Sequence, residues 1–160
     1  MTRNWSDYDL PTECHPMVRS IIDYWLSIGP ADALPGRQHF DPVDIWPLIK
    51  NVWMVDVLGT PPQFRYRVTG TKVVDYIGRE PRGQLMHEVF PHFQNTRTYE
   101  DLMSVVEERV PRWRRGHPTL RDDKNFKMVE QVSLPLARDG KTVDMILNLT
   151  VYMNIKGELC

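Results

Sequence analysis

Hydrophobic residues spaced by three and four positions indicate helices in two long segments of the chain. The first covers residues 16–28, with Pro16 suited to its first turn and Gly29-Pro30 at its end. Its apolar side consists of Val18, Ile21, Ile22, Trp25 and Ile28. The second covers residues 96–110, with Asn95, or Thr98 together with Asp101, as its expected start. Shorter helices are expected at residues 41–49, 71–77 and 84–90.

Apolar and polar residues alternate in the other segments, which is the pattern of half-buried strands. Residues 51–70 contain two such runs around the turn sequence GTPPQ, so we expect a hairpin there. The last third predicts strands at 112–121, 126–137 and 141–154, with RDG at 138–140 as a tight turn.

The order of these elements is one helix, two strands, several helices and three strands. Helices that are segregated between groups of strands are typical of an α+β domain with one antiparallel sheet. A length of 160 residues suits one domain, so we predict a flexible N-terminal arm at 1–15 and a single domain at 16–160.

Composition and charge exclude several classes of function. The net charge of −1 gives no field that would attract nucleic acid or an anionic membrane, and no apolar run approaches the ~20 residues of a membrane span. The first 16 residues lack the apolar core of a signal peptide, so we expect a cytoplasmic protein. Cys14 and Cys160 are expected to be free thiols.

No motif indicates catalysis or a metal site. In HEVFPH the histidines His87 and His92 are five residues apart and Pro91 interrupts the turn, so they cannot form the zinc-protease pair. The GTK at residues 70–72 lacks the first glycine of a phosphate-binding loop, and no Gly-x-Ser-x-Gly turn occurs. We therefore expect a protein that is not an enzyme.

An arginine-rich segment, RVPRWRRGHPTLR, surrounds Trp113. Such a patch could bind single-stranded nucleic acid, but acidic residues flank it on both sides. We interpret it as a solvated strand face, with an acidic partner or an anionic ligand as the alternative. Its arginines are Arg109, Arg112, Arg114, Arg115 and Arg121.

Four stretches together resemble a bacterial PAS-like family that was long catalogued as a domain of unknown function: YWLSIGPADALPGRQHFDP, VWMVDV, FRYRVTGTKVVDYIGREPRG and LPLARDGKTVDMI. The matching residues are Tyr24, Trp25, Leu26, Leu34, Pro35, Arg37, Phe40, Asp41, Pro42, Asp56, Val57, Phe64, Arg65, Tyr66, Arg67, Gly70, Gly78, Gly83, Pro135, Leu136, Gly140 and Asp144. Each motif is short, but their order and spacing over about residues 21–150 are specific.

The resemblance implies a five-stranded antiparallel sheet in the order 2-1-5-4-3 with helices over its concave face. PAS domains bind small molecules in that hollow, dimerise or dock onto signalling proteins. The first hypothesis is a stand-alone cytoplasmic sensory module with a small-molecule ligand. The alternative is a ligand-free interaction module with an ordinary filled core. In some PAS sensors a histidine ligates haem, so His87 or His92 could do so here, although a surface role fits them better.

Two groups of residues are candidate sites. The hollow could be lined by Trp53, Tyr66, Tyr76, Phe90, Met103, Trp113, Met128, Met145 and Asn148. Asn148 and Thr150 lie opposite the apolar stripe of the last strand, and the alternation alone does not say which face is concave. The apolar stripe of the N-terminal helix must be buried either on the outer face of its own sheet or against a second copy of the chain. The resemblance favours a homodimer, with Val18, Ile21, Ile22 and Trp25 as the candidate interface.

Overall fold

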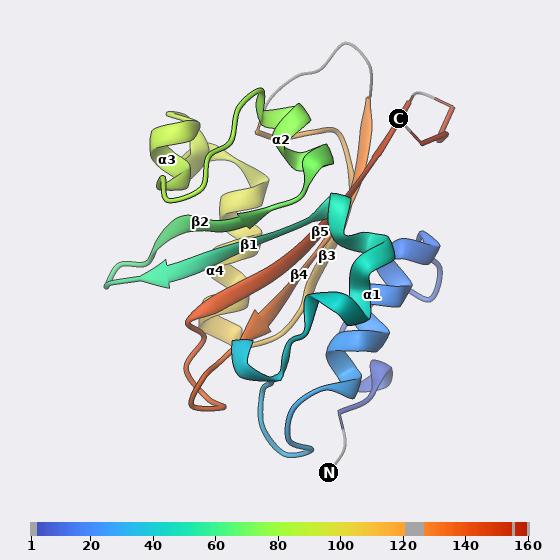
Figure 1. Cartoon of the computed structure of the whole chain (residues 1–160), viewed down its shortest axis with the longest axis vertical. Helices are drawn as coiled ribbons and strands as arrows, with labels where there is room; N and C mark the ends of the chain where they lie inside the picture. The colour runs from blue at the N-terminus through green and yellow to red at the C-terminus, as the bar shows by residue number, and fades with distance from the viewer. Residues whose placement is uncertain (1–2, 121–126, 155, 160) are drawn as a thin grey trace.

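The computed structural model describes residues 3–120, 127–154 and 156–159. It contains one five-stranded antiparallel sheet in the order β2-β1-β5-β4-β3, with helices on both faces (Figure 1). The α+β class and the strand order implied by the resemblance are therefore confirmed.

The chain runs through these elements from one end to the other. The α-helices are α1 (Pro16–Ser27), α2 (Thr71–Ile77), α3 (Met86–Val89) and α4 (Arg97–Glu108). The 3₁₀ helices are η1 (Trp5–Asp7), η2 (Arg37–His39), η3 (Pro42–Asn51) and η4 (Phe93–Asn95). The strands are β1 (Val52–Leu58), β2 (Gln63–Thr69), β3 (Arg112–Gly116), β4 (Met128–Leu136) and β5 (Met145–Met153).

Each face of the sheet has its own hydrophobic core. On one face α1 and η3 cover residues of β1, β4 and β5, while on the other α2, α3 and α4 cover β1, β2 and β5 (Figure 1). Alternation along β5 divides its side chains between the two cores: Leu147 and Leu149 belong to the α1 side, Ile146 and Tyr152 to the side of α2–α4.

The apolar side of α1 is buried against other residues of its own chain. Val18, Ile21, Ile22 and Trp25 each have 0% exposed surface, and the Trp25 indole N–H donates to the Pro135 carbonyl at 2.8 Å. The expectation that these four residues form a dimer interface is therefore corrected, because they pack against β4 and β5.

The segment expected as a flexible arm contacts the same helix. The Tyr8 ring meets the Trp25 ring edge-on with centroids 5.4 Å apart, and the Arg3 guanidinium lies 4.7 Å from the Trp25 ring centroid. The packed unit thus includes residues on the N-terminal side of the expected boundary at residue 16.

Several element ends differ from the expected ones for local reasons. The Thr96 hydroxyl caps α4 by accepting from the Tyr99 N–H at 3.2 Å, in place of Asn95 or Thr98. The turn after β4 is wider than a two-residue hairpin because the Asp139 carboxylate accepts from the backbone N–H groups of Lys141 and Thr142. Phe126, the first residue of the expected 126–137 strand, lies outside the described residues.

Gly70, which precedes α2, is required by a close backbone approach. A Cβ atom there would lie 2.2 Å from the Ile49 carbonyl oxygen and 2.4 Å from that of Lys50. We expect Gly70→Ala to lower the free energy of unfolding by about 2 kcal/mol, because backbone atoms must shift to make room. Urea denaturation measures this loss. Gly116→Ala is the matched control, since a Cβ there meets nothing within 4 Å; an equal loss in both variants would contradict the steric explanation.

Candidate functional site

The face of the sheet beneath α2, α3 and α4 contains the candidate site. Asn148 and Thr150 are 0% and 4% exposed and lie on this face, between Ile146 and Tyr152 of the same core. The face of β5 that lies beneath α2, α3 and α4 is therefore the one opposite the stripe of Leu147 and Leu149, which packs against α1.

A small cavity lies on this face, between the sheet, α2 and the segment that follows β3. Its volume is about 20 Å³, which is room for about one water molecule. Its walls combine aromatic, aliphatic and polar side chains. The lining residues are Trp53, Tyr66, Val73, Tyr76, Ile77, Thr98, Arg114, Pro118, Thr119, Leu120, Val129, Gln131, Thr150 and Tyr152.

The residues proposed from sequence for this hollow fall into three groups. Trp53, Tyr66 and Tyr76 line the cavity. Phe90, Met103 and Asn148 belong to the same side of the sheet but are not among its lining residues.

The third group, Trp113, Met128 and Met145, packs in the core on the α1 side, so its proposed place in the hollow is corrected. The reason is strand parity. Trp113 lies between Arg112 and Arg114, whose side chains reach α4, and therefore points to the opposite face.

Three polar residues form a continuous row across the sheet at the cavity. In the strand register Arg114 of β3 is opposite Gln131 of β4, which in turn is opposite Thr150 of β5. The Trp53 indole N–H donates to the Thr150 hydroxyl at 3.0 Å, and that hydroxyl donates to the Gln131 side-chain carbonyl at 2.9 Å. Hydrogen bonds thus link side chains of β1, β5 and β4 over one face of the sheet, and Arg114 of β3 continues the row without a bond to Gln131.

The row ends in a donor without an acceptor. The Gln131 side chain is buried, with only 6% of the residue exposed, and its Nε2 has no hydrogen-bond partner among the described residues. In the next row, the Ser133 hydroxyl and the Asn148 Oδ1 likewise lack partners within the described part of the chain. A buried polar atom of this kind costs about 1–3 kcal/mol. A core that serves only for packing would therefore favour apolar residues here.

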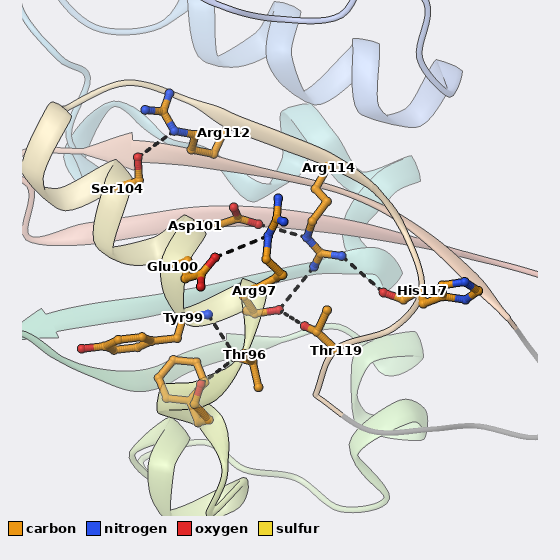
Figure 2. Close-up of polar contacts among 12 residues, drawn as sticks. Thr96, Arg97, Tyr99, Glu100, Asp101, Ser104, Arg112, Arg114, His117 and Thr119 are labelled. Carbon is orange, nitrogen blue, oxygen red and sulfur yellow. Dashed lines mark hydrogen bonds and ion pairs between the residues drawn. The ribbon is translucent and has the colours of Figure 1, made fainter.

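Arg114 connects the cavity to α4 and to the segment that follows β3 (Figure 2). Its Nε lies 3.1 Å from the Asp101 carboxylate, and its Nη atoms make long contacts of 3.4 Å to the Thr98 hydroxyl and the His117 carbonyl. Thr98 and Thr119 share a hydrogen bond of 2.6 Å. Arg114 therefore holds three segments together at one edge of the cavity.

The interpretation of the arginine-rich segment as a solvated strand face is corrected for Arg112 and Arg114, whereas Arg109 and Arg115 are exposed. The Arg114 side chain is 11% exposed, and Arg112 bonds Ser104 at 2.7 Å and pairs with Glu108, so both arginines join β3 to α4. Arg115 lies on the other face, 3.8 Å from Glu130. Arg121 lies outside the described residues.

Burial determines the charge state of the cavity walls. It raises the pKa of Tyr66 and of Tyr152, so both phenols are neutral near pH 7. Burial also raises the pKa of the Asp101 carboxyl, although the Arg114 guanidinium acts to lower it. Of the described residues that line the cavity, Arg114 is the one with a charged side chain.

His87 and His92, the candidates for haem ligation, are not among the residues that line this cavity. Within the described ranges, no group of three or more histidine, cysteine, aspartate or glutamate side chains is arranged to hold a metal ion.

Gln131 was not proposed from sequence as a site residue, although one signal for it was present. Arg114 was proposed only in the alternative interpretation of the arginine-rich segment as a site for an acidic partner or an anionic ligand. In FKMVEQVSLPLA, Gln131 and Ser133 occupy the positions that alternate with Val132 and Leu134. Polar residues on a strand that is buried on both sides indicate a built polar site. The place of Arg114 at the cavity had no signal in the sequence, because its pairing with Asp101 depends on how α4 packs on β3.

No helix in the described part of the chain has both the length and the apolar character needed to span a membrane.

Comparison with known proteins identifies the family. A family model described as PAS domain matches residues 13–151, which is most of the chain. No curated protein matches the sequence significantly. PAS domains are in general non-enzymatic modules for sensing, signalling or protein interaction. Together with the strand order and the helices over the polar face, the match shows that this chain belongs to the PAS domain family.

Proposed function

We propose that this PAS domain is a sensory module that binds a small molecule in the hollow beneath α2 and α4. The observation that carries the proposal is the Gln131 amide, which is buried at the cavity with its Nε2 unpartnered among the described residues. A bound molecule that accepts this hydrogen bond would offset its desolvation. The aromatic walls of Trp53, Tyr66 and Tyr76 supply apolar contact around the same point.

The position of Arg114 supports a route by which binding would be signalled. The same side chain lines the cavity and contacts Asp101 and Thr98 of α4. A ligand that draws the guanidinium away from its long contacts would alter how α4 packs on β3. Ligand binding would then change the surface that α4 presents to a signalling partner.

A second candidate function is an interaction module without a ligand. It is favoured by the cavity volume of about 20 Å³, because a larger molecule enters only if the surrounding side chains move. Val43 and Trp46 of η3, 73% and 68% exposed, offer an apolar surface for such a partner or for a second copy of the chain.

Native mass spectrometry of the freshly purified protein tests the first proposal. We expect an adduct on the wild-type chain that is lost in Thr150→Val, because the nearly isosteric valine removes the hydroxyl that orients Gln131. Thr12→Val is the matched control, since Thr12 is exposed, and it should retain the adduct. A wild-type chain at its bare mass would contradict the sensor, and a bare dimer would favour the interaction module.

A further inference from the structure

We propose that the hollow recognises its ligand through a carboxylate group, held by the side chains of Gln131 and Arg114. This inference rests on the proposed function and adds the chemical class of the ligand. It is carried by the direction of the hydrogen bonds in the polar row and by the charge at the end of that row.

The hydrogen bonds of the Thr150 hydroxyl orient the Gln131 amide. An indole N–H can only donate, so the Thr150 hydroxyl accepts from Trp53 at 3.0 Å and its own hydrogen is directed elsewhere. That hydrogen is donated to Gln131 Oε1 at 2.9 Å. With Oε1 accepting from the Thr150 hydroxyl, the amide NH₂ group of Gln131 lies on the side of the amide away from Thr150.

The neighbour of Gln131 on its other side is also a donor. Arg114 is opposite Gln131 in the register of β3 and β4, and directly opposed residues have their Cβ atoms about 5 Å apart. A guanidinium has no acceptor atom, so Arg114 cannot satisfy the Gln131 NH₂ group. Two donor groups thus border one cavity, and the group that completes them must supply hydrogen-bond acceptors.

Charge selects a carboxylate over a neutral carbonyl. Arg114 gives the described cavity lining its one charged side chain, and the phenols of Tyr66 and Tyr152 are neutral there. Asp101 occupies the Nε edge of Arg114 at 3.1 Å, whereas the Nη atoms make only contacts of 3.4 Å. A carboxylate would replace these long contacts by charge-assisted bonds of about 2.8 Å, roughly twice as strong as neutral ones.

Formate and formamide are suitable probes, because they are small, nearly isosteric and differ in charge. Each is titrated into the ¹⁵N-labelled full chain at constant ionic strength, while the Gln131 side-chain NH₂ and the Trp53 indole signals are followed by NMR. The Gln131 signal is assigned by its disappearance in Gln131→Met. We expect formate to shift both signals and to bind at least about tenfold more tightly than formamide.

Gln131→Glu is the decisive variant, because it replaces the donor by an anion of the same shape. We expect the introduced carboxylate to pair with Arg114 and to repel the negative charge of formate, so that formate binds more than about tenfold more weakly. Gln38→Glu makes the same change at an exposed position and should bind formate as the wild type does. If Gln131→Glu does not fold, Gln131→Met replaces it, with the indole of Trp53 as the reporter and the same loss expected.

The outcomes separate this inference from the proposed function. If formamide binds as tightly as formate, the preference for a carboxylate is overturned, while the proposal that the hollow binds a ligand stands. Formate binding that Gln131→Glu leaves unchanged would place the anion elsewhere and overturn the inference. If neither probe shifts either signal, the carboxylate inference is overturned, and the sensory proposal is decided separately by the adduct in native mass spectrometry.

Discussion

Ile22→Glu should leave the protein largely unfolded at 25 °C. Ile22 has no exposed surface and lies in the core between α1 and the sheet, so glutamate there loses the apolar contacts and buries an ionisable group without a partner. We expect a loss of at least about 5 kcal/mol, which is comparable to the whole stability of an ordinary domain. Far-ultraviolet circular dichroism during thermal and urea denaturation measures it.

Ser20→Glu places the same side chain two residues earlier on the exposed side of α1. Its free energy of unfolding should remain within about 0.5 kcal/mol of wild type. A dimer interface at Ile22 makes the opposite prediction for Ile22→Glu, namely a folded chain whose mass in solution is halved. That result would contradict the packing of α1 on its own sheet.

The overall architecture could be predicted from sequence because each element carries its own local signal. Pro16 with apolar residues at spacings of three and four defines α1, and the Asp41 carboxylate caps η3 by accepting from the Val43 N–H at 3.0 Å. The strand order did not follow from such signals. It followed from the resemblance to PAS domains, because pairings such as β1 with β5 join residues almost 100 positions apart.

The site was predicted less completely, because membership of a cavity depends on which side of a strand each residue takes. Trp53 and Tyr66 were placed in the hollow and do line it, whereas Met145 was placed there and lies on the other face. The alternation divides the side chains of a strand into two sets without indicating which set lies beneath α2–α4. The same ambiguity affects α1, whose apolar stripe suits a dimer and an internal core equally well.

Asp101→Ala should lower the free energy of unfolding by about 3 kcal/mol, because it leaves the largely buried Arg114 guanidinium without its carboxylate. Glu100→Ala is the control: it removes the adjacent acidic residue, which pairs with Arg97 (Figure 2). Because the Arg97 side chain is 66% exposed, we expect the free energy of unfolding to change by less than about 0.5 kcal/mol. Both values are measured by urea denaturation at pH 7.

The double variant Asp101→Ala with Arg114→Met separates the two costs of this ion pair. Burial raises the pKa of Asp101 despite the nearby Arg114, which indicates that the attraction between the charges only partly offsets their desolvation. Removing both charges should therefore restore part of the stability that Asp101→Ala alone loses. The opposite result is a double variant that is less stable than Asp101→Ala by the full cost of a second, independent substitution. Arg114 would then stabilise the domain through its contacts with Thr98 and His117, and its guanidinium would tolerate the loss of the Asp101 carboxylate.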